Sequence, residues 1–464
     1  MLVDLVLKNA RLVTPDGVFQ GGVAVDDGKI VSISSDVNLP PASEVIDCAG
    51  KIVMPGVIDP HIHIGLHVPL EDDCHTETAS AAVGGVTTAG RFVRSLKSYK
   101  NFFMDEINVM NNNSYIDMFC HFGIMHFEHV KEIPDYADEF GVTSFKFYGK
   151  YGIELMSYRE TPPLDVIQQT DDGLMYHGFV EIAKLGEMAV ACVHAENYEI
   201  IHWLKKKLRE QGRKDLPAWT EARPWFCEAE YMQKALFLSK IAGNTLYNVH
   251  LSIGAGVDLI EKAMHEGVRV YAETCPHYLV LTKDSPIAPI RGKISPPLRE
   301  KSDIEMLWNG ISRGIIKTIG SDHVIIPKTD DLWTSWPGVP GLATLLPIIL
   351  SEGVNKGRIP LEKVPEICSR NAAKIFNIYP KKGILQVGSD ADLVVVDLKR
   401  EEILRAENLY SKCGWTPYEG MRVKGVPVMT IVRGVKVMED RTVIEKPGVG
   451  RYIPRSLSGH SQGM

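Results

Sequence analysis

The chain has 464 residues, of which 45% are hydrophobic and 23% charged, and its formal net charge is −7 at pH 7. This balance is typical of a globular protein, and the length allows one large barrel with a smaller domain. The negative charge and the lack of a basic patch argue against a nucleic-acid partner. No apolar run reaches the roughly 20 residues that span a membrane, and we expect no signal peptide. Eight scattered cysteines without a CxxC pair indicate free thiols and a cytoplasmic location.

Short strands are predicted at both ends of the chain. The N-terminal region contains the segments VDLVLKNARLV and GGVAVDDGKIVSI, which alternate like strands and are separated by turn-forming residues. A similar pattern returns in residues 391–397 and 426–444. We therefore predict one small β-sandwich built from residues 1–53 and 386–464, interrupted by a central domain of residues 54–385.

The central region alternates between strand and helix patterns. Strands are predicted at 57–63, 85–92, 117–124, 143–149, 188–194, 245–252, 269–275 and 316–322. Amphipathic segments such as GFVEIAKLGE lie between most of them. This order predicts an α/β fold, a (β/α)8 TIM-type barrel, whose functional groups lie at the C-terminal ends of the strands. A doubly wound open sheet is the alternative, but no GxGxxG turn follows a strand.

Candidate metal ligands fall at the ends of four predicted strands. His61 and His63 share one face of the first strand, because alternate side chains of a strand point the same way. His194, His250 and Asp322 end the fifth, sixth and eighth strands. Imidazole and carboxylate groups are ligands that zinc accepts. Each residue has a structural alternative, such as a helix N-cap for Asp322, but their joint placement favours a metal site.

Lys146 lies in the fourth predicted strand and is flanked by aromatic residues. An unpaired ammonium would be costly to bury there, which favours the neutral amine. A neutral amine can react with carbon dioxide to give a carbamate, an anionic group that could bridge two metal ions. The alternative is a partly exposed lysine whose stem packs against the barrel.

The segments MPGVIDPHIH, SFKFYGKY, VHAEN, ETCPHYL, SPPLR and GSDH, in this order, resemble those of the cyclic amidohydrolases. This group of the amidohydrolase superfamily includes hydantoinase, dihydropyrimidinase, allantoinase and dihydroorotase. The resemblance implies a binuclear centre of two divalent metal ions, usually zinc. The implied ligands are His61 and His63 for the first metal, His194 and His250 for the second, N6-carboxylated Lys146 between them, and Asp322 on the first metal.

The resemblance also implies an activity, the hydrolytic opening of a cyclic amide or ureide by a metal-bridging hydroxide. Asp322 would transfer the proton, Tyr151 would support the oxyanion, and the backbone of Ser295 would contact the ring amide of this small-molecule substrate. Tyr148 is a rival for the role of Tyr151, and Ser295 could simply form a turn before Pro296. A homo-oligomer, either a tetramer or a dimer, is implied as well.

Two departures from the family pattern bear on the substrate. Gly65 stands where dihydroorotase has an arginine for its substrate carboxylate, which argues against that activity. Hydantoinases read the ring amide with an asparagine in the region of residues 335–341, and this chain has none there. His67 is expected to be a loop residue rather than part of the pocket. The alternatives left open are an allantoinase-like enzyme, a non-cyclic amide hydrolase on the same site, and a non-catalytic scaffold related to dihydropyrimidinase, which the complete ligand set disfavours.

Overall fold

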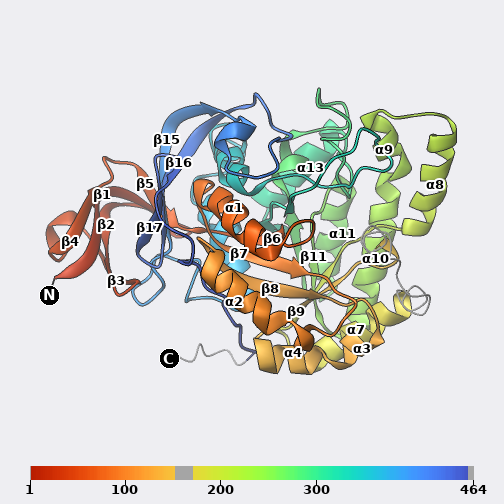
Figure 1. Cartoon of the computed structure of the whole chain (residues 1–464), viewed down its shortest axis with the longest axis horizontal. Coiled ribbons are helices and arrows are strands. Elements are labelled where there is room, and N and C mark those ends of the chain that lie inside the picture. The colour runs from red at the N-terminus through yellow and green to blue at the C-terminus, as the bar shows by residue number, and fades with distance from the viewer. Residues whose placement is uncertain (1, 152–170, 458–464) are drawn as a thin grey trace.

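The computed structural model describes residues 2–151 and 171–457 and contains two nine-stranded sheets (Figure 1). One sheet curls into a barrel with helices packed around it. The other, drawn at the left of Figure 1, combines strands from the red N-terminal end and the blue C-terminal end of the chain. The predicted α/β fold, a TIM-type barrel with a second sheet from both chain ends, is therefore confirmed.

The second sheet joins the two ends of the chain directly. Its N-terminal strands are β1 (Val3–Thr14), β2 (Gly17–Asp26), β3 (Lys29–Ser34), β4 (Ala42–Asp47) and β5 (Ile52–Pro55). Its C-terminal strands are β15 (Leu393–Ile403), β16 (Arg422–Val432), β17 (Val435–Glu439) and β18 (Thr442–Val443). Strands β5 and β15 pair antiparallel, and apolar side chains from both ends share one buried cluster. The domain boundaries expected after residues 53 and 385 stay a prediction.

The barrel contains every strand predicted for the central region. They are β6 (Val57–His63), β7 (Val86–Val93), β8 (Asp117–Gly123), β9 (Ser144–Phe147), β10 (Val190–Val193), β11 (Thr245–Asn248), β12 (Val270–Thr274), β13 (Ile316–Ile319) and β14 (His323–Val324). The eighth predicted strand, 316–322, is shorter in the structure, and the additional strand β14 begins just after the predicted range. Because β13 pairs with β12 and β14 pairs with β6, these two strands together close the barrel.

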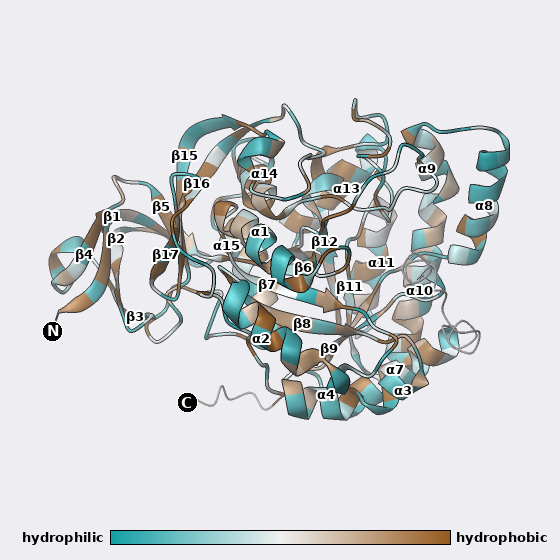
Figure 2. Cartoon of the chain, viewed as in Figure 1, coloured by the Kyte–Doolittle hydropathy of each residue, from teal (hydrophilic) through white to brown (hydrophobic). Residues whose placement is uncertain are grey.

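Helices cover the outside of the barrel. They include α1 (Leu70–Val83), α2 (Phe103–Asn113), α3 (Phe127–Lys131), α4 (Ile133–Phe140), α7 (Asp172–Lys184), α8 (Tyr198–Glu210), α9 (Leu216–Ala222), α10 (Trp225–Ala242), α11 (Gly254–His265), α12 (Pro276–Val280), α13 (Lys301–Ser312), α14 (Leu345–Ile348), α15 (Lys363–Pro365) and α16 (Asn371–Ile375). Figure 2 shows hydrophobic residues on the inner strands and polar residues on outward surfaces such as that of α8. All eight residues of β7 are buried, as expected for a strand covered on both faces.

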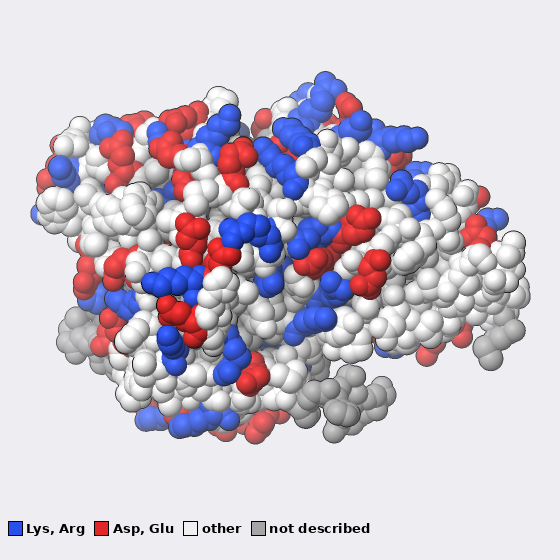
Figure 3. All heavy atoms as spheres, turned by 180° about the vertical axis from the view of Figure 1, so that it is seen from behind, with Lys and Arg blue, Asp and Glu red and all other residues white. Residues whose placement is uncertain are grey.

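The outer surface carries charges of both signs. On the face shown in Figure 3, lysines and arginines are interspersed with acidic residues. Many charged residues of the protein form exposed ion pairs, such as Lys240 with Glu266 at 3.0 Å, which contribute little to stability individually. Among the described residues, no helix combines the length and the apolar character needed to cross a membrane.

Asp59 connects the first and last strands of the barrel from a fully buried position. One of its carboxylate oxygens accepts hydrogen bonds from the backbone N–H groups of His61, at 3.1 Å, and Ser321, at 3.0 Å. Burial raises the pKa of this carboxyl group to about 7, although the hydrogen bonds that it accepts lower the pKa. Asp59 therefore fixes the backbone of the HxH segment relative to the residue that precedes Asp322.

A buried ion cluster holds the second sheet against the barrel. The ammonium of Lys382 lies 2.6 Å from a carboxylate oxygen of Asp117, at the start of β8, and 3.0 Å from Asp390. It also contacts Asp392, while Arg433 of the loop after β16 contacts Asp117. The ammonium of Lys382 and the three carboxylates are almost completely buried, so the stability of each buried charge depends on its partners.

We predict that Lys382→Met destabilises the protein by about 3–5 kcal/mol, because it leaves a group of buried carboxylates without their central cation. The free energy of unfolding from urea denaturation measures this loss. Lys381→Met removes the same charge from an exposed neighbouring position and should change stability by less than about 0.5 kcal/mol. Equal effects of the two substitutions would contradict the structural role of the cluster.

Candidate active site

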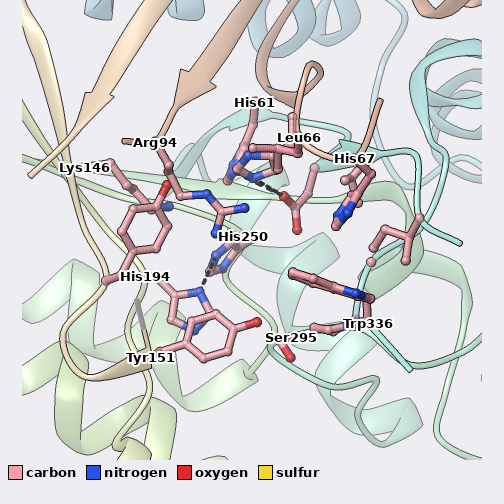
Figure 4. Close-up of a pocket in the computed structure, with 17 residues that line it drawn as sticks. His61, Leu66, His67, Arg94, Lys146, Tyr151, His194, His250, Ser295 and Trp336 are labelled. Atoms are coloured by element: carbon pink, nitrogen blue, oxygen red, sulfur yellow. Dashed lines mark hydrogen bonds and ion pairs between the residues drawn. The ribbon is translucent and has the colours of Figure 1, made fainter. Parts of the chain in front are cut away.

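A pocket lies at the C-terminal ends of the barrel strands, and the structure brings all eight sequence-predicted site residues to it (Figure 4). They are His61, His63, Lys146, Tyr151, His194, His250, Ser295 and Asp322. The residues come from six barrel strands or the loops after them. The fold therefore gathers positions that are up to 261 residues apart in the sequence (61 to 322).

The first group of candidate ligands combines two imidazoles and a carboxylate. One oxygen of Asp322 lies 3.2 Å from Nε2 of His61 and 3.1 Å from Nε2 of His63, and these two nitrogens are 3.2 Å apart. Ligand atoms of all three residues lie within 4.8 Å of one another. Such a set of nitrogen and oxygen atoms fits a zinc-type divalent ion.

Glu273 fixes the orientation of His61. This glutamate is the penultimate residue of β12, and its Oε1 lies 2.7 Å from Nδ1 of His61. The contact leaves Nε2 of His61 facing His63 and Asp322, which is the arrangement by which a carboxylate orients a metal-binding histidine. Burial raises the pKa of Glu273 to about 8, and the hydroxyl of Tyr247 donates a hydrogen bond to its second oxygen at 2.8 Å.

The second group contains His194 and His250, whose Nδ1 and Nε2 atoms are 2.9 Å apart. Nε2 of His194 contacts Glu196 at 2.9 Å, and Arg223 holds the same carboxylate at 2.5 Å. The ring of His250 lies 5.5 Å from that of His61, which joins the two groups. Burial lowers the pKa of all four imidazoles, which favours the neutral form that binds metal ions.

Lys146 is buried between aromatic rings. Its side chain is 1% exposed, with Nζ 4.8 Å from the ring centroid of Phe92 and 5.4 Å from that of Tyr148. No ion pair joins this Nζ to another residue in the described part of the chain. Burial lowers the pKa of Lys146 to about 8, so the neutral amine is accessible near neutral pH.

Two candidate ligands have unusual backbone conformations. His250 has φ +40° and Asp322 has φ +49°, both in the left-handed region that residues other than glycine rarely adopt. Asp322 lies in the break between β13 and β14. Local backbone strain of this kind concentrates at functional sites, where it directs a side chain that a regular strand would point elsewhere.

The two predicted substrate-contacting residues also line the pocket. The ring of Tyr151 stacks on that of His194, with centroids 4.3 Å apart and planes at 20°. Tyr148, the rival for its role, lines the same pocket, as does Ser295. The roles assigned to Tyr151 and Ser295 stay predictions, because position alone does not distinguish a substrate contact from a wall residue.

Several pocket residues were missed by sequence reasoning. Arg94 and Leu66 line the pocket, and so does His67, which was expected only as a loop residue. The segment without the expected asparagine contributes Trp336, Pro337 and Gly338. Lys328 holds this segment by donating to the carbonyl oxygens of Trp336, at 2.9 Å, and Gly338, at 3.0 Å. A search for charged residues just after predicted strands would have found Arg94.

Known proteins match this chain over nearly its full length. A family model described as the amidohydrolase family matches residues 165–437. L-hydantoinase of Paenarthrobacter aurescens is 36% identical, with 98% of each chain covered, and allantoinase of Bacillus licheniformis is 33% identical, with 98% of this chain and 100% of the relative covered. The crystal structure of dihydropyrimidinase from Brevibacillus agri has a TM-score of 0.89 at 31% identity, covering 97% of this chain and 98% of that one.

This chain belongs to the amidohydrolase family. The family predicted from the sequence motifs is confirmed, and with it the hydrolase class of the enzyme. Amidohydrolases depend on metal ions, and the group formed by His61, His63 and Asp322 is suited to hold one. A second group of three carboxylates, around Asp117, instead surrounds the ammonium of Lys382.

We predict that Glu273→Gln lowers the affinity of the protein for its metal about 10–100-fold, because the imidazole of His61 loses the carboxylate that orients it. Competition with a chelator, followed by measurement of bound zinc, gives the affinity. Glu266→Gln, an exposed change at the end of α11, is the matched control and should leave the affinity unchanged. A Glu273→Gln protein that binds zinc as tightly as the control would contradict this account.

Proposed function

We propose that this amidohydrolase opens the ring of a small cyclic amide or ureide, such as a hydantoin or a dihydropyrimidine, at a binuclear zinc centre. The observation that carries the proposal is the convergence of four imidazoles, a buried lysine and a carboxylate on one pocket. The names of its relatives support the substrate class: hydantoinase, allantoinase and dihydropyrimidinase. The residues best placed as ligands are His61, His63 and Asp322 in one group, His194 and His250 in the other, and Lys146.

Lys146 supplies the anionic group between the two metal positions. Its neutral amine attacks carbon dioxide, a carbon–nitrogen bond forms, and one proton leaves, which gives an N6-carboxylated lysine with two oxygen atoms. Two divalent metal ions held by these residues would supply a hydroxide at neutral pH and polarise the ring carbonyl. The burial of Lys146 and the lack of an ion-pair partner among the described residues support this modification.

Asp322 moves the proton. Its carboxylate lines the pocket, within 3.2 Å of Nε2 of His61 and of His63. It accepts the proton of the attacking water and delivers it to the ring nitrogen as the ring carbon–nitrogen bond breaks. The carbonyl carbon gains an oxygen and becomes a carboxylate, while the nitrogen leaves as part of an open-chain amide or ureide.

Tyr151 and Ser295 position the ring. The phenol of Tyr151 donates a hydrogen bond to the oxygen that becomes negatively charged during attack, and the backbone of Ser295 contacts the ring amide. Because the segment around Trp336 has no asparagine, the backbone of Ser295 is the principal contact that we assign to the ring amide of the substrate. The cytoplasmic location and the tetrameric or dimeric state expected from the sequence stay predictions.

We predict that Lys146→Ala abolishes measurable ring opening and reduces bound metal well below two ions per chain, because the bridging group is lost. A screen of hydantoin, dihydrouracil, allantoin, succinimide and dihydroorotate measures the activity, and elemental analysis measures the metal. Added short carboxylic acids should restore part of the activity of the variant. Full activity of Lys146→Ala without such acids would refute a bridging carbamate, and a metal-free wild-type protein that opens these rings would refute the proposed function.

We predict that Tyr151→Phe lowers kcat about 10²–10³-fold with little change in bound metal, because it removes a single donor to the oxyanion. Tyr176→Phe, a change on α7 away from the pocket, controls for the loss of a phenol. Steady-state kinetics on the best substrate of the screen measures the effect. A decrease of less than about threefold would transfer the role to Tyr148, and Tyr148→Phe would then show the large effect.

A further inference from the structure

Arg94 places a positive charge in the substrate pocket. It follows β7 by one residue, so it lies at the same rim of the barrel as the histidines of β6. Its guanidinium carbon is 5.6 Å from the ring centroid of Tyr148. Figure 4 shows the side chain directed into the pocket, towards His61 and His250. The guanidinium is therefore within reach of a bound ring.

Arg94 has no acidic partner among the described residues. In the segments that the structure describes, no carboxylate forms an ion pair with it, and its buried Nε has no hydrogen-bond partner. Among the described residues, Asp322 is the one carboxylate that lines the pocket, and it contacts the histidines of β6 instead. Arg91, on the same strand, shows the contrast, because its guanidinium is paired with Glu106 at 2.7 Å. A cation held without such a partner is available to a ligand.

The charge of the surroundings makes an anionic ligand favourable. Arg94 lines the same pocket as His63, a member of the first group of candidate ligands. The metal ions of the proposed centre would add further positive charge, and like charges in a partly buried site repel one another strongly. A carboxylate beside Arg94 offsets this repulsion and can accept two parallel hydrogen bonds from the guanidinium.

The pocket has one side that carries Arg94 and one apolar side. Figure 4 places Arg94 on one side, and Leu66 and Trp336 on the other. The apolar side is a single cluster formed by Leu66, Val324, Ile326 and Trp336. A ring lying between these two sides would place an apolar edge against the cluster and a charged substituent towards Arg94.

We infer that the substrate is a cyclic amide that carries a carboxylate, and that Arg94 binds this carboxylate. This inference rests on the proposed function, because it assigns the substrate class of the same site. The sequence has Gly65 where dihydroorotase has its carboxylate-binding arginine. In this chain a guanidinium reaches the pocket from the end of β7 instead. The lack of an arginine at position 65 therefore does not restrict the pocket to uncharged rings.

A matched substrate pair tests the inference. Hydantoin with a carboxymethyl group on C5 and its carbamoylmethyl analogue have nearly the same shape but differ in charge. We expect the zinc-loaded wild-type enzyme to open the carboxylate at least tenfold more efficiently, as kcat/KM. Arg94→Met should reduce this discrimination ratio at least thirtyfold, mainly through KM of the carboxylate, and Arg94→Lys should retain part of it. Lys97→Met removes an exposed cation of the same loop and should leave the ratio unchanged.

A binding measurement gives a readout that does not depend on turnover. Orotate, an unsaturated ring carboxylate, and orotamide, its neutral analogue, are titrated into the wild-type, Arg94→Met and Lys97→Met proteins by calorimetry. We expect orotate to bind at least tenfold more tightly than orotamide to the wild type and to the Lys97→Met control, and this preference to disappear in Arg94→Met.

The two measurements separate the inference from the proposed function. Ring opening that favours the neutral hydantoin, or a ratio unchanged in Arg94→Met, overturns the inference and leaves the proposed function in place. If no ring is opened at all, the proposed function fails, and the calorimetry alone tests the role of Arg94. Equal binding of orotate to the wild type and Arg94→Met then overturns that role. Loss of the preference for orotate over orotamide in Arg94→Met supports it.

Discussion

The site depends on the connection that Asp59 makes between the first and last strands of the barrel. Its buried carboxylate binds the backbone N–H groups of His61 and Ser321 at the same time. Asp322, the next residue after Ser321, follows with a left-handed backbone. This single buried side chain therefore holds the backbone that carries the imidazoles of β6 against the backbone that precedes the proposed proton carrier.

Around that connection, the electrostatics of the site follow from burial. Five groups of the site, His61, His194, His250, Lys146 and Glu273, are buried, and His63 is partly exposed. Burial shifts the pKa of each of the six in the direction that favours its neutral form. Neutral imidazoles and a neutral amine are the states that can bind metal ions or react with carbon dioxide. The carboxylates beneath them, Glu273 and Glu196, fix ring orientations. The interior is thus arranged to receive cations, and Arg94 at the rim is arranged to receive an anion.

The rest of the chain supports this arrangement. Strand β5 of the second sheet is followed directly by β6 of the barrel, which carries the HxH segment. The segment therefore lies one strand away from the junction between the two sheets. The ion cluster of Lys382 joins the same sheet to the start of β8, at the end of the barrel opposite the pocket. Chemistry and stability are therefore placed at opposite ends of the barrel, which leaves the pocket loops free to vary with the substrate.

The sequence by itself determined the barrel, the sheet built from both chain ends, the family and the set of candidate ligands. Local sequence patterns carry the information about the strands and the candidate ligands. These patterns are the strand periodicity and the placement at strand ends of His61, His63, His194, His250 and Asp322. Only the tertiary structure decided that Arg94 enters the pocket with no acidic partner among the described residues, that Glu273 holds His61, and that Trp336 and Leu66 form one wall. These facts depend on which loops meet above the strands and on which charges are paired. Packing between residues that are distant in the sequence determines the loop contacts and the charge pairs, and no local sequence pattern encodes that packing.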